Sequence, residues 1–261
     1  MREKLHNHTT YYVRTDGSDS NLGLENTSGG AFLTVQKAIN HILNDIDTNR
    51  YNVTIQVGNG TYTSGGYISR RIVGGGTLFI FGDTTTPSNV VINVTTAGDR
   101  GFSSLNENNN LIIRGFRIQT NNGDAIAAIN GGNIYFGEIE FGNCGTGAHL
   151  NSFQHAQIAC IQNYSIIGSA AFHAIAQFNS TLRVQSRAIT LTGTPSFGYF
   201  FAYVYHSALV DFFATTFSGT ATGTRYGGQM LSVIGTGLQN SSATYFPGNV
   251  NGSVGNGSVY I

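Results

Sequence analysis

The chain has 261 residues, of which only 10% are charged, and its 13 basic residues balance its 13 acidic residues. Ordinary globular domains contain roughly 25% charged residues. The neutral balance excludes the basic footprint of a dedicated nucleic-acid-binding protein and the polybasic patch of a membrane-surface protein. With 40% hydrophobic residues, 35 Gly and only 3 Pro, the composition predicts a folded protein of short strands and tight turns rather than a disordered chain.

The N-terminal segment and the cysteines indicate the compartment. Residues 1–12 (MREKLHNHTTYY) have no apolar core of the kind that a signal peptide needs, and the sequence has no 18-residue apolar run. The two cysteines, Cys144 and Cys160, are too few for a disulfide framework or a four-ligand zinc site. We therefore expect a chain made in the cytoplasm, without membrane insertion, and a buried free thiol at Cys160, which lies in an apolar strand pattern.

The first element expected along the chain is an amphipathic helix within residues 32–46 (FLTVQKAINHILNDI). Apolar residues recur there with the spacing that gives a helix one buried stripe, and Thr34 precedes them as the N-cap. The stripe consists of Val35, Ala38, Ile39, Ile42, Leu43 and Ile46. This pattern predicts an N-terminal arm over residues 1–30 and a capping helix within residues 31–50.

Strands are expected after the helix, first at residues 53–57, 77–81 and 90–94. From residue 111 onward similar segments recur every 23–28 residues. They begin at Leu111, Ile134, Ile158, Leu182 and Val210, with a weaker sixth at Leu238. In the first five, apolar first and third positions flank a variable second position, which is the period of a strand with one buried face.

Equivalent positions of the repeats define columns that should stack. The third positions are Ile113, Phe136, Cys160, Val184 and Phe212, and the eighth positions are Ile118, Phe141, Ser165, Ile189 and Phe217. A second strand-like stretch in each repeat begins at Ala125, Ala148, Ala171, Tyr199 and Gln229. A unit of this length suits one turn of a parallel β-helix, whose rungs stack about 4.8 Å apart. Leucine-rich repeats would need an Asn or Cys ladder, which this sequence lacks.

These patterns predict an all-β fold, a parallel β-helix over residues 51–246. The capping helix should close its N-terminal end, because an open solenoid end exposes apolar side chains and unpaired strand edges. Residues 247–261 are uncharged and rich in Gly and Asn. We expect this tail to cover the last rung or to contact a partner chain, as in a trimer.

Several segments resemble the start of proteins with the pectin-lyase-like right-handed β-helix: YYVRTDGSDSNLG, TVQKAI, VTIQVGNGTY, LFIFGD and VVINV. The ending FPGNVNG…GSVYI is similar to endings of bacteriophage virion proteins of this group, which are tailspikes, tail fibres and related surface proteins. The resemblance spans most of the chain, and its motifs are markers of fold. It implies a right-handed β-helix, commonly a homotrimer, on a virus particle, and does not by itself imply an enzyme.

The same group contains esterases, lyases and glycoside hydrolases, so we looked for their carboxylates. Methylesterases of this group use a tryptophan and two carboxylates on neighbouring strands, and this sequence has no Trp. The DFFAT fragment at Asp211 has no partner aspartate one rung earlier, so we expect Asp211 to pair with Arg183 instead. Glu138 and Glu140 lie two residues apart on one expected strand, at the roughly 6–7 Å separation that glycoside hydrolysis uses. The repeat places Arg117 beside Glu140, which favours an ion pair over a general acid.

Metal sites have two candidate locations in the sequence. His149 and His173 occupy equivalent positions of adjacent repeats, where they could share a divalent metal or simply stack in the wall of the β-helix. Asp16 and Asp19 (TDGSDSN) resemble a calcium loop that lacks its bidentate Glu, and Asx turns account for them better. We expect no cofactor.

An aromatic run at residues 199–205 is the candidate contact surface. Alternating Tyr and Phe in a strand place one set inward and the other outward. Outward Tyr199, Tyr203 and Tyr205, with Tyr226 in the following loop, could stack on a sugar or pack against a neighbouring subunit. We favour the subunit contact.

The sequence therefore predicts a structural or host-surface-engaging bacteriophage virion protein, non-enzymatic, of the tail fibre, tailspike or capsid decoration type. The expected partners are two further copies in a homotrimer, other virion proteins at the particle surface and a host cell-surface polysaccharide. One alternative is a tailspike-type polysaccharide depolymerase that uses Glu138 and Glu140. Another is a bacterial surface adhesin, which the missing secretion signal opposes.

Overall fold

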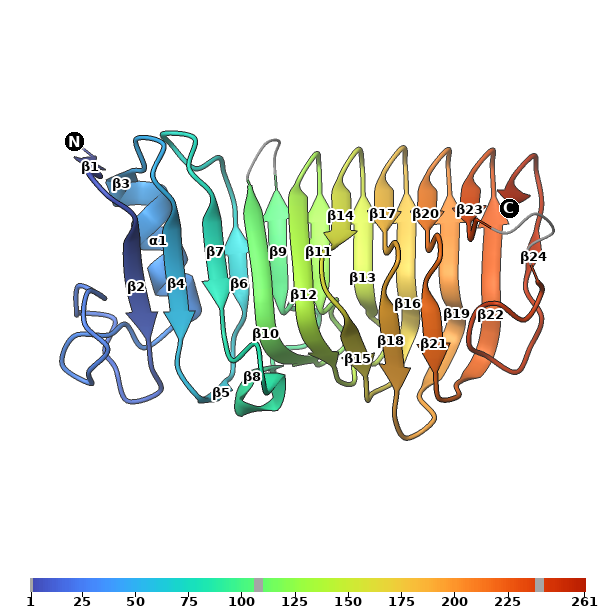
Figure 1. The fold of residues 1–261 in the computed structure, drawn as a ribbon, viewed down its shortest axis with the longest axis horizontal. Helices are drawn as coiled ribbons and strands as arrows, with labels where there is room; N and C mark the ends of the chain where they lie inside the picture. Colours follow the sequence, from blue (N-terminus) through green and yellow to red (C-terminus); the bar gives the residue numbers. More distant parts are fainter. Residues whose placement is uncertain (1, 106–109, 238–241) are drawn as a thin grey trace.

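The chain folds as a right-handed parallel β-helix, as the sequence predicts (Figure 1). The computed structural model describes residues 2–105, 110–237 and 242–261. In Figure 1 the chain descends on the near side of the coil and ascends on the far side while it advances from the N-terminal to the C-terminal end, so the coil is right-handed. Paired strands of successive rungs run parallel.

The strands form three faces around the coil, of which the first two belong to one sheet and the third to another. The first face consists of β2 (Thr9–Val13), β4 (Val53–Val57), β7 (Leu78–Phe81), β10 (Leu111–Thr120), β12 (Asn133–Phe141), β14 (Gln157–Cys160), β17 (Thr181–Arg183), β20 (Leu209–Asp211), β23 (Val233–Gly235) and β25 (Val259–Tyr260). The second face consists of β5 (Gly60–Tyr62), β8 (Val90–Val94), the later parts of β10 and β12, β15 (Tyr164–Ile166), β18 (Ala188–Leu191) and β21 (Thr216–Ser218). The third face consists of β6 (Gly66–Ile68), β9 (Phe102–Leu105), β11 (Ile126–Ile129), β13 (Ala148–Phe153), β16 (Ala170–Gln177), β19 (Ser196–Tyr205), β22 (Thr222–Gln229) and β24 (Ser253–Val254).

Side chains of the first face fill the lumen in the predicted columns. Ile113 pairs with Phe136, which pairs with Cys160. These three, together with Val184 and Phe212 in the later rungs, are exposed by no more than 7%. The stacking predicted from the period-two pattern is therefore confirmed, and each rung buries its apolar side chains against those of the neighbouring rungs.

The predicted eighth-position column is wrong after its second member. Phe141 pairs with Ile166, which pairs with Leu191, whereas Ser165 and Ile189 belong to other columns. The reason is the corner between the first and second faces, which gains one residue in each of these two rungs. A fixed spacing then places the wrong side chain in the lumen.

The weaker sixth repeat also differs from the prediction. Leu238 lies outside the described residues, and the strand that pairs with β20 is β23, in which Ile234 lies beside Val210. The stretch from Gln229 therefore contains the end of β22 and the whole of β23. Ile234 follows Val210 by 24 residues, which lies within the 23–28-residue spacing of the earlier rungs.

Two-residue turns in the left-handed conformation connect the third face to the first. Both residues have positive φ in the successive pairs Asn130–Gly131, Gln154–His155, Phe178–Asn179, His206–Ser207 and Met230–Leu231. Each turn continues the hydrogen-bond ladder, as from His155 N to Phe178 O at 3.0 Å. A non-glycine residue in this conformation costs of order 1 kcal/mol or more, and the continuous ladder offsets that cost.

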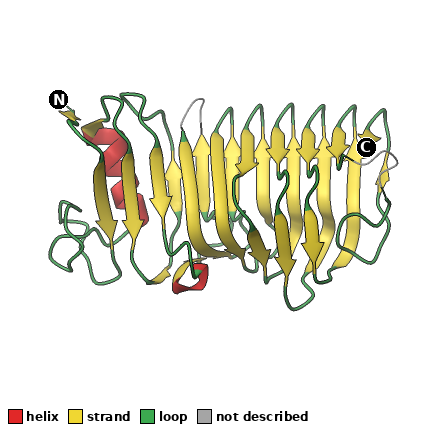
Figure 2. Ribbon diagram, in the orientation of Figure 1, coloured by secondary structure: helices red, strands yellow, loops and turns green. Residues whose placement is uncertain are grey.

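The helix α1 (Val35–Asp45) lies at the N-terminal end, where it packs against β2, β4 and β6 (Figure 2). The predicted stripe is buried, and the Thr34 side chain accepts a hydrogen bond from Lys37 N at 3.1 Å as the N-cap. Ile46 begins the short strand β3 (Ile46–Asp47), which pairs with β1 (Glu3–Lys4). Within residues 1–30, β2 already pairs with β4 as a strand of the first face. In the described part of the chain, no helix combines the length and apolar character that a membrane crossing requires.

Phe246 closes the C-terminal end of the lumen. Its side chain is 1% exposed, and its ring centre lies 5.7 Å from that of Phe201 and 5.3 Å from that of Phe212. The neighbouring Tyr245 hydroxyl donates to Phe212 O at 2.7 Å and holds the segment in place. Residues 247–261 then supply β24 and β25, which continue the third and first faces.

We predict that Phe246→Ala lowers the free energy of unfolding by about 3–5 kcal/mol, because it empties the end of the aromatic lumen. Phe213→Ala is the matched control, since Phe213 is 49% exposed on the surface. Urea unfolding of both variants tests this. A loss below about 1 kcal/mol for Phe246→Ala would contradict the role of this ring as a plug.

Candidate functional site

An aromatic ridge lies on the outside of the third face. We define the aromatic ridge as Phe172, Tyr199, Phe200, Tyr203 and Tyr205. The ring of Phe172 lies 5.2 Å from that of Tyr199 and 5.7 Å from that of Tyr203. The rings of Phe200 and Tyr203 stack at 4.9 Å with planes 18° apart, and Tyr203 and Tyr205 are nearly parallel at 6.3 Å. Tyr199 is 62% exposed, and the other four are half-buried.

A β-bulge in β19 places these rings together. Ala170 pairs with Phe197 and Phe172 with Phe200, so β19 has one more residue than β16 between the two pairs. The additional residue lets Tyr199 and Phe200 both lie outside, while Phe201 is fully buried in the lumen. Bulges of this kind re-aim side chains beside functional surfaces.

Three of the four predicted contact tyrosines belong to this ridge, and Tyr226 does not. Tyr226 is only 8% exposed, and its ring stacks at 4.0 Å on that of Tyr260, near the Phe246 plug. It was predicted in a loop, but it lies in β22. Phe172 and Phe200 are ridge members that were not predicted, although both occur in the strand-like stretches that begin at Ala171 and Tyr199.

The two candidate catalytic carboxylates lie outside the coil, and each is paired with an arginine of the preceding rung. Arg114 binds Glu138 through two hydrogen bonds, from Nε to Oε2 at 2.6 Å and from Nη2 to Oε1 at 2.5 Å. Arg117 binds Glu140 in the register that the sequence predicted. The Glu138 carboxylate raises the pKa of Arg114. Both carboxylates are thus held as acceptors of charged donors, an arrangement that works against a general acid.

Glu138 has a structural reason to occupy its position. It lies at the corner between the first and second faces with φ of 45°, and the equivalent corner residue one rung earlier is Gly115 with φ of 80°. Its amide donates to Asn163 O at 3.0 Å, so the ladder continues through the corner. The missed signal was this glycine, which marks a left-handed corner in the repeat.

Asp211 lies beside Arg183 in the predicted register, but its partner is different. It accepts hydrogen bonds from the Gln185 side chain and from Phe213 N. Among the described residues, the ion pairs do not include one between Asp211 and Arg183. Asp211 therefore fixes the local turn.

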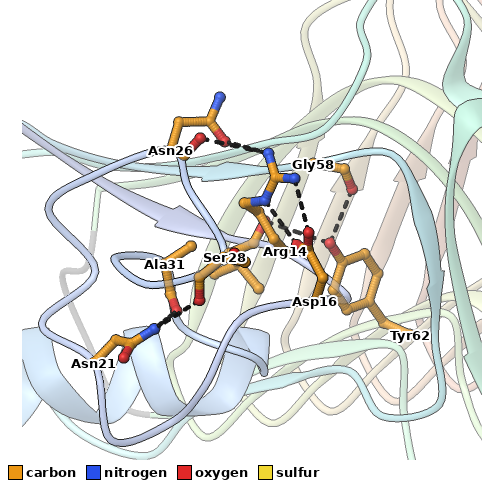
Figure 3. Close-up of polar contacts among 9 residues, drawn as sticks. Arg14, Asp16, Asn21, Asn26, Ser28, Ala31, Gly58 and Tyr62 are labelled. Atoms are coloured by element: carbon orange, nitrogen blue, oxygen red, sulfur yellow. Dashed lines mark hydrogen bonds and ion pairs between the residues drawn. The ribbon is translucent and has the colours of Figure 1, made fainter.

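The TDGSDSN segment forms a pinned loop. Figure 3 shows Arg14 between Asp16 and Asn26, with Arg14 Nε 2.8 Å from Asp16 Oδ1 and Arg14 Nη1 3.1 Å from Asn26 Oδ1. Asp19 accepts three hydrogen bonds at the start of α1, from Leu33 N, Thr34 N and the Thr34 hydroxyl. Both aspartates have structural partners, but these are the Arg14 side chain and the residues that begin α1, and not the backbone two residues further on that an Asx turn would use. Within the described ranges, no group of three or more His, Cys, Asp or Glu side chains is arranged to hold a metal ion.

His149 and His173 lie side by side inside the lumen, both fully buried, with their Nδ1 atoms 3.1 Å apart. The prediction that they stack on adjacent rungs is confirmed by the register of β13 and β16. All four ring nitrogens take part in hydrogen bonds, because His149 Nε2 lies 3.0 Å from Gly142 O and His173 Nε2 lies 2.7 Å from the Tyr164 hydroxyl. This arrangement favours a hydrogen-bonded chain over a metal site.

Comparisons with known proteins add little beyond this geometry. No family model matches the chain, and no curated protein matches it. Among solved structures, the chain is similar to the pectin methylesterase from Aspergillus niger, with 13% sequence identity and a TM-score of 0.44. The match covers 100% of this chain and 92% of that one.

We predict that Glu138→Ala destabilises the protein more than Glu138→Gly by about 1 kcal/mol. Both variants lose the pair with Arg114, but only glycine relieves the left-handed backbone at the corner. Urea unfolding of the two proteins measures the difference. Equal stabilities, or a more stable alanine variant, would contradict the assignment of Glu138 to a left-handed corner.

Proposed function

We propose that this chain is a structural, surface-engaging protein of a bacteriophage particle, without enzymatic activity, that associates with copies of itself through the aromatic ridge. The observation that carries the proposal is the row of stacked rings on the outside of the third face, of which Tyr199 is 62% exposed and the others are half-buried. Aromatic side chains are enriched at the cores of protein interfaces, where each supplies a large rigid apolar area. The sequence resemblance to virion β-helix proteins supports the setting and the trimeric state.

The distribution of charge supports a second copy as the occupant of the ridge. Of the 121 residues from 141 to 261, only four are charged: Arg183, Arg187, Asp211 and Arg225. When one surface lies on the three-fold axis of a trimer, its three copies converge there, and like charges on it would repel. None of the four lies in β16 or β19. β16 and β19 can therefore meet their counterparts in other copies without repulsion between their own side chains, while Arg225 of the adjacent β22 donates to Asn251 Oδ1 at 3.0 Å.

The absence of enzymatic activity is supported by the arginine pairs. A retaining or inverting glycosidase needs one carboxyl group that keeps a proton near neutral pH. Arg114 and Arg117 each hold their glutamate in a charge-assisted pair, in which the carboxylate accepts from the guanidinium. The depolymerase alternative would require one of these glutamates to leave its arginine.

Sedimentation at micromolar concentration tests the proposed self-association. The expected mass is three times the 27.8 kDa of one chain. Tyr199→Ser combined with Tyr203→Ser should raise the dissociation constant at least about 30-fold, since interface hot spots contribute 2 kcal/mol or more.

Tyr67→Ser is the matched control, because Tyr67 is a 42% exposed tyrosine at the other end of the third face, in β6. It should leave the mass unchanged. A wild-type monomer at this concentration would contradict self-association. A monomer that binds host polysaccharide through Tyr203 would assign the ridge to a glycan instead.

A further inference from the structure

A buried chain of polar groups runs through the lumen directly beneath the aromatic ridge. It connects Tyr164 of β15, His173 of β16, His149 of β13 and Gly142 O, with successive separations of 2.7, 3.1 and 3.0 Å. The two histidines have no exposed surface, and Tyr164 is only 5% exposed. The mechanism of self-association does not use these groups, so their presence in an aromatic lumen needs its own explanation.

The position of each proton in this hydrogen-bonded chain follows from the carbonyl group of Gly142 at one end. Gly142 O only accepts, so His149 Nε2 carries a proton and, in the neutral ring, Nδ1 does not. His173 Nδ1 must then donate to His149 Nδ1, which leaves His173 Nε2 to accept from the Tyr164 hydroxyl. Three protons satisfy three hydrogen bonds. One additional proton would set two N–H groups against each other or reverse the tyrosine hydroxyl.

The surroundings of the two imidazoles are mainly apolar. Rings of Phe141, Phe197, Phe201 and Phe212 surround the two imidazoles at centre distances of 4.6–6.3 Å. The titratable groups around the two rings are Tyr164 itself, the thiols of Cys144 and Cys160, and the Asp124 carboxylate, which accepts a hydrogen bond from Ala148 N at 3.0 Å and pairs with Arg100. Burial raises the pKa of both thiols to about 12, and that of Tyr164 well above its ordinary value, so all three are neutral. No carboxylate of the described residues is hydrogen-bonded or ion-paired to either ring.

We propose that the chain Tyr164–His173–His149 is an acid-sensitive latch that holds β19, and with it the aromatic ridge, in register. The ring centre of His173 lies 6.0 Å from that of Phe197 and 4.6 Å from that of Phe201. These two residues flank the bulge that turns Tyr199 and Phe200 outward. Protonation of the hydrogen-bonded groups Tyr164, His173 and His149 requires the lumen to open around them. The strand β19 then loses the packing that fixes the aromatic ridge. The latch itself is independent of the proposed function, and only its effect on association rests on that function.

The direction of the pH dependence follows from burial. Desolvation lowers the pKa of His149 to about 4 and that of His173 well below its ordinary value. The unfolded or opened state therefore binds protons more readily than the closed state below about pH 6.5. The stabilising contribution is complete above that pH and is lost as the pH falls toward 4. Each histidine adds up to about a tenfold change in the opening equilibrium per pH unit.

Amide hydrogen exchange on β16 and β19 tests the latch, expressed as protection factors at about pH 7 and about pH 4.5. Wild-type protection should fall by roughly 100-fold or more between the two. In the combined variant Tyr164→Phe, His149→Phe and His173→Phe, which replaces all three polar side chains with similar apolar shapes, the fall should be under about tenfold. His155→Gln, at an exposed turn histidine, should behave as wild type.

Equal protection of wild type and the combined variant at both pH values would overturn the latch. A combined variant that fails to fold is replaced by His173→Gln alone, which removes one titrating ring and should halve the slope of the logarithm of protection with pH. Protection that falls in wild type while the sedimentation mass stays unchanged would keep the latch and contradict the ridge as the self-association surface.

Discussion

The whole molecule depends on the in-register stacking of parallel rungs. A parallel ladder places equivalent residues about 4.8 Å apart along the axis, so each position in one rung determines the neighbours of the same position in the next. Inside the coil this constraint creates columns such as Ile113 on Phe136, in which burial favours apolar side chains. Outside, it creates pairs such as Arg117 on Glu140 and rows such as the aromatic ridge.

The same constraint separates structural from functional polar groups. A carboxylate that faces an arginine one rung away is held in an ion pair. The histidines of the lumen are kept uncharged by desolvation and by their proximity to each other. What remains available to a partner in the C-terminal half is an aromatic third face whose strands β16 and β19 carry no charged residue. The glutamates and histidines thus have partners within the β-helix itself, and the surface offered to a partner is largely apolar.

Much of this architecture could be read from the sequence, and the failures have a common cause. The first-face columns and α1 were predicted correctly because their apolar spacing is regular within one strand or helix. The eighth-position column failed because the corners lengthen: Phe141 follows Ile134 by seven residues, whereas Ile166 follows Ile158 by eight. The outward ridge could be predicted only in part, because a bulge in β19 determines the direction of Phe200, and Tyr226 was read as a loop residue although it lies in a strand.

Glu138 and Glu140 are held in ion pairs on the outside of the coil. Incubation of the protein with host capsular polysaccharide or lipopolysaccharide tests most directly whether they have only this structural role. New reducing ends report hydrolysis, and absorbance of an unsaturated uronate reports elimination. We expect neither product after prolonged incubation with excess protein. Release of either product by the wild-type chain, abolished by Glu138→Gln or Glu140→Gln, would contradict the account.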